Sequence, residues 1–466
     1  MGTRKRKRAR PRRKRDYFSD TPAEIIDHVM SFVPRSGLIN LCLVNKSLRS
    51  YAEPFLYSTV VFEYAENWQP PIINLLQTLL RRPELLAYIR TLALGGNDRA
   101  ETKLYSLKPI GYRVQSYMPI IERLRLPVTN LWVRRLREAH VDAFAALLIA
   151  QAPNIRRLTI ADNWLRSPDL LTQLLRHGAL GQPPMWKRLE QLVFFAPFVV
   201  QTPDVAMTTF YLSTVTDLAV SLGDMQVLPW PTAEPDLDHL ISLDVTLRDV
   251  MSNCATMVAG LLARTRCLKS LYLEWEYYPD ATGMDFEEIV PALPPVKATL
   301  ESLRLRMEFS RHWRLRDDPN MTPNGSLGSL LDFDRITRFE VPLVALAGCG
   351  VDAKSLIPSI PRNVEELSLS TDLIYENVKW LPDLSNHGPH ESIVSVIEES
   401  FRHYRTSLPR LRCIKIIDTV NGFKGGRIER LLEETSPVDG IDIEIVRDML
   451  SPWRENLDDL WDAFWK

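Results

Sequence analysis

Cysteine is scarce in this sequence, and no long apolar run is present. The five cysteines are an odd, scattered set without a CxxC pair, which argues against a disulfide framework and against a zinc module. The longest apolar run covers only residues 143–150, well short of the roughly 18 to 20 residues that a membrane-spanning helix needs. The basic amino terminus has no apolar signal-peptide segment. We therefore expect a protein of the nucleus and/or cytoplasm, without a membrane partner.

The sequence motifs of the common enzyme classes are also missing. No phosphate-binding loop, nucleophile elbow, kinase motif set or HExxH helix occurs. His387 and His390 have a loose metal-ligand spacing, but Gly388-Pro389 between them indicates a loop, and no further ligand cluster accompanies them. We therefore expect a non-catalytic protein without a bound metal or cofactor.

Charge is nearly balanced over the whole chain but is unevenly distributed. Ten of the twelve residues from 4 to 15 are basic, so removing these ten charges from the net charge of −1 leaves about −11 for the rest. Such a block repels itself and cannot bury apolar surface, so residues 1–17 are predicted to form a disordered basic tail. We interpret the tail as a nuclear-import signal for an import receptor. The residues of that signal are Arg4, Lys5, Arg6, Lys7, Arg12, Arg13, Lys14 and Arg15.

The tail also leaves a second interpretation open. Dense basic segments contact nucleic acid as well as import receptors. The acidic remainder of the chain would repel phosphate, so a nucleic-acid partner is the less favoured of the two. A nuclear interaction or nucleic-acid-binding protein that uses this tail is therefore the alternative function.

Two amphipathic helices are predicted directly after the tail. Thr21-Pro22 is typical of a helix start, apolar residues recur at helical spacing from Ile25 to Val33, and Pro34 ends the helix. A second apolar stripe runs from Leu38 to Leu48. Two short helices cannot cover each other's stripes, so we expect part of this apolar surface to be left for a partner or a following domain.

The same segment carries a long ordered pattern. Its members are Pro22, Glu24, Ile25, Ile26, Val29, Phe32, Leu38, Leu41, Leu43, Val44, Asn45, Lys46, Ala52, Glu53, Pro54, Leu56 and Tyr57. With this pattern, residues 18–62 resemble an F-box of the form common among fungal proteins. The resemblance implies docking onto the Skp-family adaptor of a cullin–RING ubiquitin ligase. The side chains expected to contact the adaptor are Pro22, Ile25, Ile26, Val29, Leu38, Leu41 and Val44, of which about half would pack inside a unit of this size.

A six-residue pattern, apolar-x-x-apolar-x-apolar, returns throughout the rest of the chain. Its copies begin at Tyr57, Ile89, Val128, Ile155, Leu189, Val215, Leu240, Leu268, Leu300, Ile336, Val364, Leu411 and Val438. Most steps are 25 to 36 residues long, and helical patterns fill many intervals, such as 141–150, 167–178 and 250–262. Strands that alternate with helices at this spacing are parallel and are joined by crossovers.

This alternation resembles leucine-rich repeats in an irregular form, because the asparagine that ends the family's strand motif occurs only at Asn97 and Asn163. We predict an α/β protein with a short all-α F-box at residues 18–62 and a leucine-rich-repeat-like solenoid at residues 63–450. A capping helix is predicted at 451–466, where apolar residues share one helical face. The alternative is a compact α/β domain with an open parallel sheet.

Strand geometry assigns a role to each position of the pattern. The fourth and sixth residues of a copy point into the core, and the third, fifth and seventh face the concave surface. Aromatic and arginine side chains are enriched in binding hot spots. The candidates for contact with an unknown protein substrate are therefore Trp132, Phe195, Tyr272, Arg304 and Arg306. Together these features predict a substrate-recognition subunit of an SCF-type (Skp–cullin–F-box) ubiquitin ligase.

Overall fold

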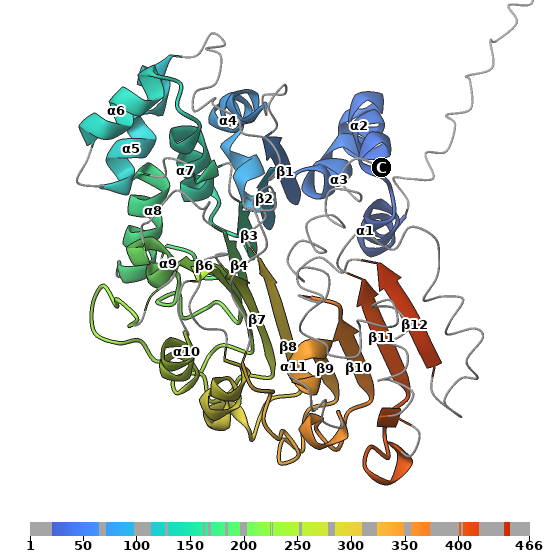
Figure 1. Cartoon of the computed structure of the whole chain (residues 1–466). Helices are drawn as coiled ribbons and strands as arrows, with labels where there is room; N and C mark the ends of the chain where they lie inside the picture. The colour runs from blue at the N-terminus through green and yellow to red at the C-terminus, as the bar shows by residue number, and fades with distance from the viewer. Residues whose placement is uncertain are drawn as a thin grey trace, which may run out of the picture.

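The computed structural model contains a unit of three short helices followed by one long curved sheet (Figure 1). The residues that the structure describes are 21–64, 71–96, 113–125, 129–161, 164–165, 169–181, 185–195, 203–223, 225, 227–250, 254–277, 285–309, 324–348, 356–372, 400–401, 404–418 and 442–447. The predicted basic tail, the predicted capping helix, Asn97, Asn163 and the His387–His390 pair lie outside them.

The amino-terminal unit has three helices where the sequence predicted two. They are α1 (Ala23–Ser31), α2 (Arg35–Val44) and α3 (Lys46–Leu56). The second apolar stripe is divided at Asn45, whose extended backbone separates α2 from α3 and whose side-chain oxygen accepts a hydrogen bond of 2.8 Å from the backbone N–H of Leu48. This asparagine therefore caps α3 and sets the boundary between the two helices.

All twelve strands belong to one parallel sheet, and their order in the sheet is their order in the chain. They are β1 (Thr59–Tyr64), β2 (Thr91–Gly96), β3 (Arg157–Ile160), β4 (Gln191–Phe194), β5 (Asp217–Gly223), β6 (Ser242–Val250), β7 (Ser270–Tyr277), β8 (Ser302–Phe309), β9 (Arg338–Pro342), β10 (Glu366–Ser370), β11 (Cys413–Asp418) and β12 (Asp442–Arg447). The predicted α/β class with parallel strands is confirmed. The unbroken order is that of a solenoid-like fold, in which each strand contacts only its neighbours in the chain.

Helices occupy the crossovers in the first half of the sheet and lie on its convex side (Figure 1). They are α4 (Ile72–Arg81), α5 (Met118–Leu124), α6 (Thr129–Arg137), α7 (Val141–Gln151), α8 (Asp169–Leu180), α9 (Pro203–Thr209) and α10 (Ala255–Leu262). After β7 the described crossovers are shorter, with 3₁₀ turns such as Phe286–Glu288 and Val290–Ala292 and the five-residue α11 (Leu343–Ala347). Prolines at 291 and 294 favour short turns over a continuous helix in this part of the chain. No helix within the described ranges is long and apolar enough to cross a membrane.

One predicted strand is wrong. Residues 129–133 of the copy that begins at Val128 lie in α6, where Trp132 and Leu136 are buried one helical turn apart. Its apolar positions also fit a helix, and arginines occupy the last turn, where they interact favourably with the helix dipole. The interval between β2 and β3 is therefore a long crossover that holds α5, α6 and α7.

The sheet separates two apolar regions. Side chains at the fourth and sixth positions, such as Leu243 and Val245 on β6, are fully buried in the main core with the crossover helices. The predicted inward orientation of these positions is confirmed for β1 to β11. A smaller cluster at the first strands has Val61, Ala93 and Val193 on the opposite face. The rest of that face is more polar and carries the groove described below.

Candidate functional site

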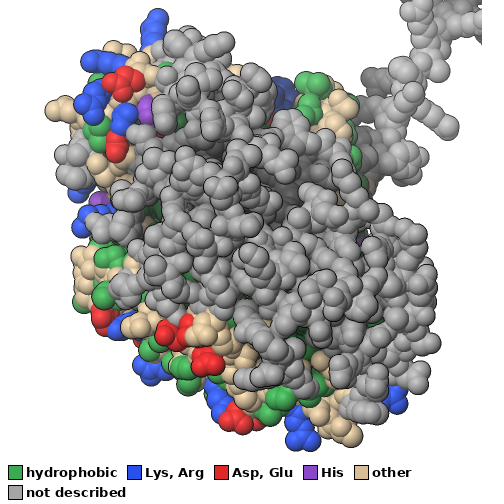
Figure 2. Space-filling model, viewed as in Figure 1, with side chains coloured by type: hydrophobic (Ala, Val, Ile, Leu, Met, Phe, Trp, Pro, Cys, Tyr) green, Lys and Arg blue, Asp and Glu red, His purple; other side chains and the backbone are tan. Residues whose placement is uncertain are grey.

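The three-helix unit exposes an apolar surface. Of the nine large hydrophobic side chains that are exposed among the described residues, six lie on α1, on α2 or in the turn between them. We name these six the α1–α2 strip: Ile25, Val29, Phe32, Ile39, Leu43 and Val44. Figure 2 shows hydrophobic side chains over α2. An exposed apolar patch that is concentrated on one small unit is typical of a protein–protein contact surface.

The seven predicted adaptor contacts divide between this surface and the interior. Pro22, Ile25, Val29 and Val44 are exposed, and Leu41 is half-buried against the core of the unit. Ile26 and Leu38 are buried, with 1% and 6% of their surface exposed, so they do not belong to the open surface.

The helical period explains why Ile26 and Leu38 are buried while their neighbours are exposed. Ile26 and Met30 lie one turn apart on the inner face of α1 and pack with Leu38 and Ala52, which gives the unit a core of its own. Sequence reasoning missed Phe32, Ile39 and Leu43 as exposed side chains, although Phe32 and Leu43 belong to the F-box-like pattern.

Ion pairs attach the three-helix unit to the sheet. Glu53 on α3 is 7% exposed and accepts hydrogen bonds from the Nη2 of Arg82 at 2.8 Å and the Nε of Arg49 at 2.6 Å. The hydrogen bond from Arg82 is the main reason that the pKa of Glu53 is lowered to about 2. Because Arg82 ends α4, this pair joins the unit to the first crossover. Within the unit, the Nη1 of Arg35 on α2 donates a hydrogen bond of 3.0 Å to the carbonyl oxygen of Leu56 on α3.

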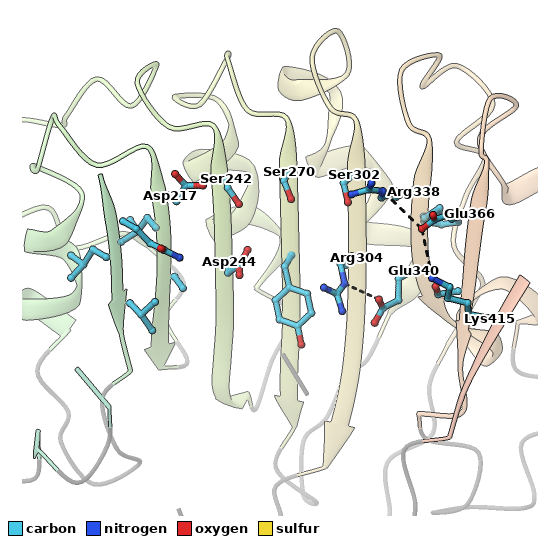
Figure 3. Close-up of a pocket in the computed structure, with 18 residues that line it drawn as sticks. Asp217, Ser242, Asp244, Ser270, Ser302, Arg304, Arg338, Glu340, Glu366 and Lys415 are labelled. Carbon is cyan, nitrogen blue, oxygen red and sulfur yellow. Dashed lines mark hydrogen bonds and ion pairs between the residues drawn. The ribbon is translucent and has the colours of Figure 1, made fainter. Parts of the chain in front are cut away.

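A groove of about 310 Å³ runs across β4 to β11, on the face of the sheet opposite the crossover helices (Figure 3). The strand register arranges its side chains in two rows. The first row is Gln191, Asp217, Ser242, Ser270, Ser302, Arg338 and Glu366. The second row is Val193, Ala219, Asp244, Tyr272, Arg304, Glu340, Ser368 and Lys415. The second row is therefore apolar at β4 and β5 and mostly polar or charged from β6 onward, whereas the first row is polar throughout.

The predicted substrate contacts are only partly in this groove. Tyr272 and Arg304 line it, on neighbouring strands. Arg306 follows in the next row, where it is 8% exposed and its Nε lies 2.8 Å from a carboxylate oxygen of Asp372. Phe195 is completely buried in the small apolar cluster. Trp132, on α6, is buried on the convex side of the sheet. The structure thus brings Tyr272, Arg304 and Arg306 together and separates the other two.

The bases of the groove are paired with acids. The Nε of Arg304 lies 2.7 Å from an Oε of Glu340, and its guanidinium carbon lies 5.3 Å from the centre of the Tyr272 ring. Arg338 and Lys415 lie 3.9 Å and 3.8 Å from the carboxylate of Glu366. Each of these three bases therefore has a carboxylate partner, and Glu366 is shared by two of them.

Two acids of the groove have no such partner. Neither Asp217 nor Asp244 forms an ion pair with any described residue. The pKa of Asp244 is raised to about 7, mainly by burial; Arg304 opposes the increase, and the negative charges of Asp217 and Glu274 contribute to it. Asp244 stands at the fifth position of its copy, so its place on this face was predicted. It was not among the predicted substrate contacts, because these were chosen from aromatic and arginine side chains only.

The described residues contain no group of three or more His, Cys, Asp or Glu side chains that could hold a metal ion. The chemistry that the groove offers is recognition through hydrogen bonds, charge and an aromatic ring. No protein-family model matches this chain, and no curated protein matches its sequence.

Proposed function

We propose that this protein is the substrate-recognition subunit of an SCF-type ubiquitin ligase. The α1–α2 strip would bind a Skp-family adaptor and, through it, a cullin–RING ligase. The parallel sheet, as a leucine-rich-repeat-like solenoid, would hold a protein target in the groove. The observation that carries the proposal is the strip itself, because six exposed apolar side chains are concentrated on a unit of three helices that has an F-box-like sequence.

The size of the strip is adequate for an adaptor contact. Burial of one aliphatic side chain contributes roughly 1.5 to 3 kcal/mol, before the cost of association is deducted. Phe32 and Leu43 are the most exposed members, at 75% and 80%, and therefore have the most surface to bury against a partner. The unit keeps its own core of Ile26, Met30, Leu38 and Ala52, so the strip is not needed for its folding.

The role proposed for the protein is tethering and not catalysis. A receptor that holds a target on the same assembly as a ubiquitin-conjugating enzyme turns an encounter between two molecules into a reaction within one complex. The contacts between Glu53 and Arg82 support this role, because they fix the adaptor-binding unit relative to the sheet.

The test is co-purification of the tagged full-length chain with the Skp-family adaptor and the cullin. Leu43→Asp and Val29→Asp place a charge in the strip, and each is expected to reduce recovery of both proteins by at least tenfold. Val227→Asp is the matched control, because Val227 is 78% exposed and lies far along the chain from the strip. Recovery that is equal for all four chains, or absent with the unaltered chain, would contradict the proposal.

A further inference from the structure

Positive charge gathers on one part of an otherwise acidic chain. Residues 113–137 contain six arginines, no lysine and a single acid, Glu122. The chain without its basic tail carries about −11, so setting apart the +5 of this segment leaves about −16 for the rest. Figure 2 shows Lys and Arg side chains gathered over α5 and α6. A local excess of charge of one sign attracts molecules of the opposite sign.

Five of the six arginines are exposed, and we name them the arginine surface. They lie before the 3₁₀ turn η2 (Val114–Tyr117), at the end of α5 and on α6: Arg113, Arg123, Arg125, Arg134 and Arg137. None of their side chains forms an ion pair or a hydrogen bond with a residue that the structure describes. The sixth, Arg135, is half-buried and pairs with Asp169 at the start of α8. The five exposed guanidinium groups are therefore available to a partner.

The arginine surface stands on a fixed frame. The elements η2, α5 and α6 contact one another and bury side chains in the main core, namely Tyr117, Ile120, Ile121, Trp132 and Leu136. Arg134 and Arg137 lie one turn apart on the face of α6 opposite Trp132 and Leu136. With its nine residues α6 is about 13 Å long, a length that about four residues of an extended chain can follow. The surface therefore suits a short segment.

The backbone at Arg125 supports a role beyond folding. This residue ends α5 with φ of 50° and ψ of 31°, in the left-handed region. Glycine or asparagine usually occupies such a position, because a larger side chain crowds the backbone there. The arginine makes no ion pair or side-chain hydrogen bond with the described residues in return. Strained residues of this kind cluster at binding sites.

The residue types favour an acidic protein segment over a nucleic acid. The planar guanidinium of arginine matches a carboxylate through paired hydrogen bonds. Leu124, Leu131 and Val133 are half-buried between the arginines and offer apolar contacts that a phosphate backbone cannot use. Glu122 and Glu138 are exposed beside the arginine surface and would repel a continuous phosphate chain, whereas a protein segment can place uncharged side chains opposite them.

We propose that the arginine surface is a docking site for an acidic segment of a partner protein. Carboxylates of the segment pair with the guanidinium groups, and its apolar side chains contact Leu124, Leu131 and Val133. The surface lies with the crossover helices on the convex side of the sheet, and its elements are not those of the α1–α2 strip. The proposal therefore goes beyond the receptor function and does not depend on it.

The test is selection of a displayed library of random linear peptides on the full-length chain, followed by fluorescence anisotropy with the selected peptides. Peptides rich in Asp and Glu are expected to be enriched. Joint replacement of Arg134 and Arg137 by alanine is expected to weaken their binding by about tenfold. The matched control replaces Arg335 and Arg362, two exposed arginines elsewhere that form no ion pair with a described residue, and should leave the affinity unchanged.

The basic tail requires a control of its own, because its ten charges attract acidic peptides as well. Replacement of Arg12, Arg13, Lys14 and Arg15 by alanine removes twice as many charges as the double variant on α6. It is nevertheless expected to weaken binding less, because the contacts lie on the arginine surface. A tail variant that weakens binding as much as the α6 variant would overturn the proposal.

Arg125→Gly separates binding from folding. Glycine adopts the left-handed conformation freely, so the unfolding temperature should not fall, while the affinity for acidic peptides should fall by about threefold. No enrichment of acidic peptides, or equal affinity of the α6 variant and the unaltered chain, would overturn the proposal. Binding of a short duplex DNA that is tighter than peptide binding and depends on Arg134 and Arg137 would also overturn it, in favour of a nucleic acid.

Discussion

Arg82, at the end of α4, donates hydrogen bonds to both carboxylate oxygens of Glu53 on α3. These residues are 29 positions apart, and their contact joins the three-helix unit to the first crossover of the sheet. The orientation of the α1–α2 strip relative to the groove therefore depends on this pair.

Glu53→Gln tests that connection. Loss of the carboxylate leaves Arg82 with weaker hydrogen bonds at a mostly buried position, so a cost of about 2 kcal/mol in the free energy of unfolding is expected. Urea denaturation measures it, and limited proteolysis between α3 and α4 reports detachment of the unit. Glu84→Gln is the control, because Glu84 also pairs with Arg82 but has a side chain that is 56% exposed, so its substitution should change the stability much less than Glu53→Gln does. Equal effects of the two substitutions would contradict this account.

The same carboxylate predicts a pH dependence. Its pKa is lowered from 4.5 to about 2 in the folded protein, so the stabilisation is complete above pH 4.5 and is lost as the pH falls toward 2. The difference in unfolding free energy between the unaltered chain and Glu53→Gln should therefore shrink across this interval. A difference that stays constant from pH 5 down to about 2 would mean that the ion pair is not its source.

Substitution of Asp142 on α7 is also expected to lower the stability of the protein. It is completely buried, and its two carboxylate oxygens accept hydrogen bonds of 2.8 Å from the backbone N–H groups of Leu170 and Leu171 in the first turn of α8. Asp142→Ala leaves both donors unpaired and should cost about 2 kcal/mol by urea denaturation. Asp142→Asn keeps an acceptor oxygen and should cost less. An alanine variant as stable as the unaltered chain would show that this contact between crossovers contributes little.

Two glycines within helices predict opposite effects of the same substitution. A Cβ at Gly178 in α8 would lie 2.3 Å from the ring of Trp186, so Gly178→Ala should destabilise the protein by about 1 to 3 kcal/mol. A Cβ at Gly260 in α10 would have no neighbour closer than 4.0 Å, so Gly260→Ala should stabilise it by about 0.5 to 1 kcal/mol. Thermal unfolding of the two variants measures the difference, and shifts of the same sign would contradict it.

The basic tail remains a prediction from the sequence. Replacement of Arg12, Arg13, Lys14 and Arg15 by alanine should remove nuclear accumulation of a fluorescent fusion if the tail is an import signal. Adaptor recovery from the same variant should be unchanged, since the strip lies on α1 and α2. Accumulation that does not depend on these residues would refute the import signal.

The sequence by itself determined the parallel strands and the direction of their side chains. The pattern of apolar residues has the period of a strand, and a pair such as Leu243 and Val245 has to be buried whichever strands lie beside it. The same reasoning placed Tyr272, Arg304 and Asp244 together on the opposite face. The strand prediction failed for the copy that begins at Val128, because three apolar positions at this spacing also fit a helix. Only packing against α7 and the core selects between helix and strand there.

Tertiary structure alone decided which side chains are accessible and which charges are paired. Ile25 and Ile26 are neighbours with the same side chain, yet one is 54% exposed and the other is 1% exposed. The difference comes from Leu38 and Ala52, which other helices bring against Ile26. Likewise Arg304 meets Glu340 across 36 residues, whereas Asp244 forms no ion pair with a described residue. Exposure and pairing depend on residues distant in the chain, and a local pattern contains no information about them.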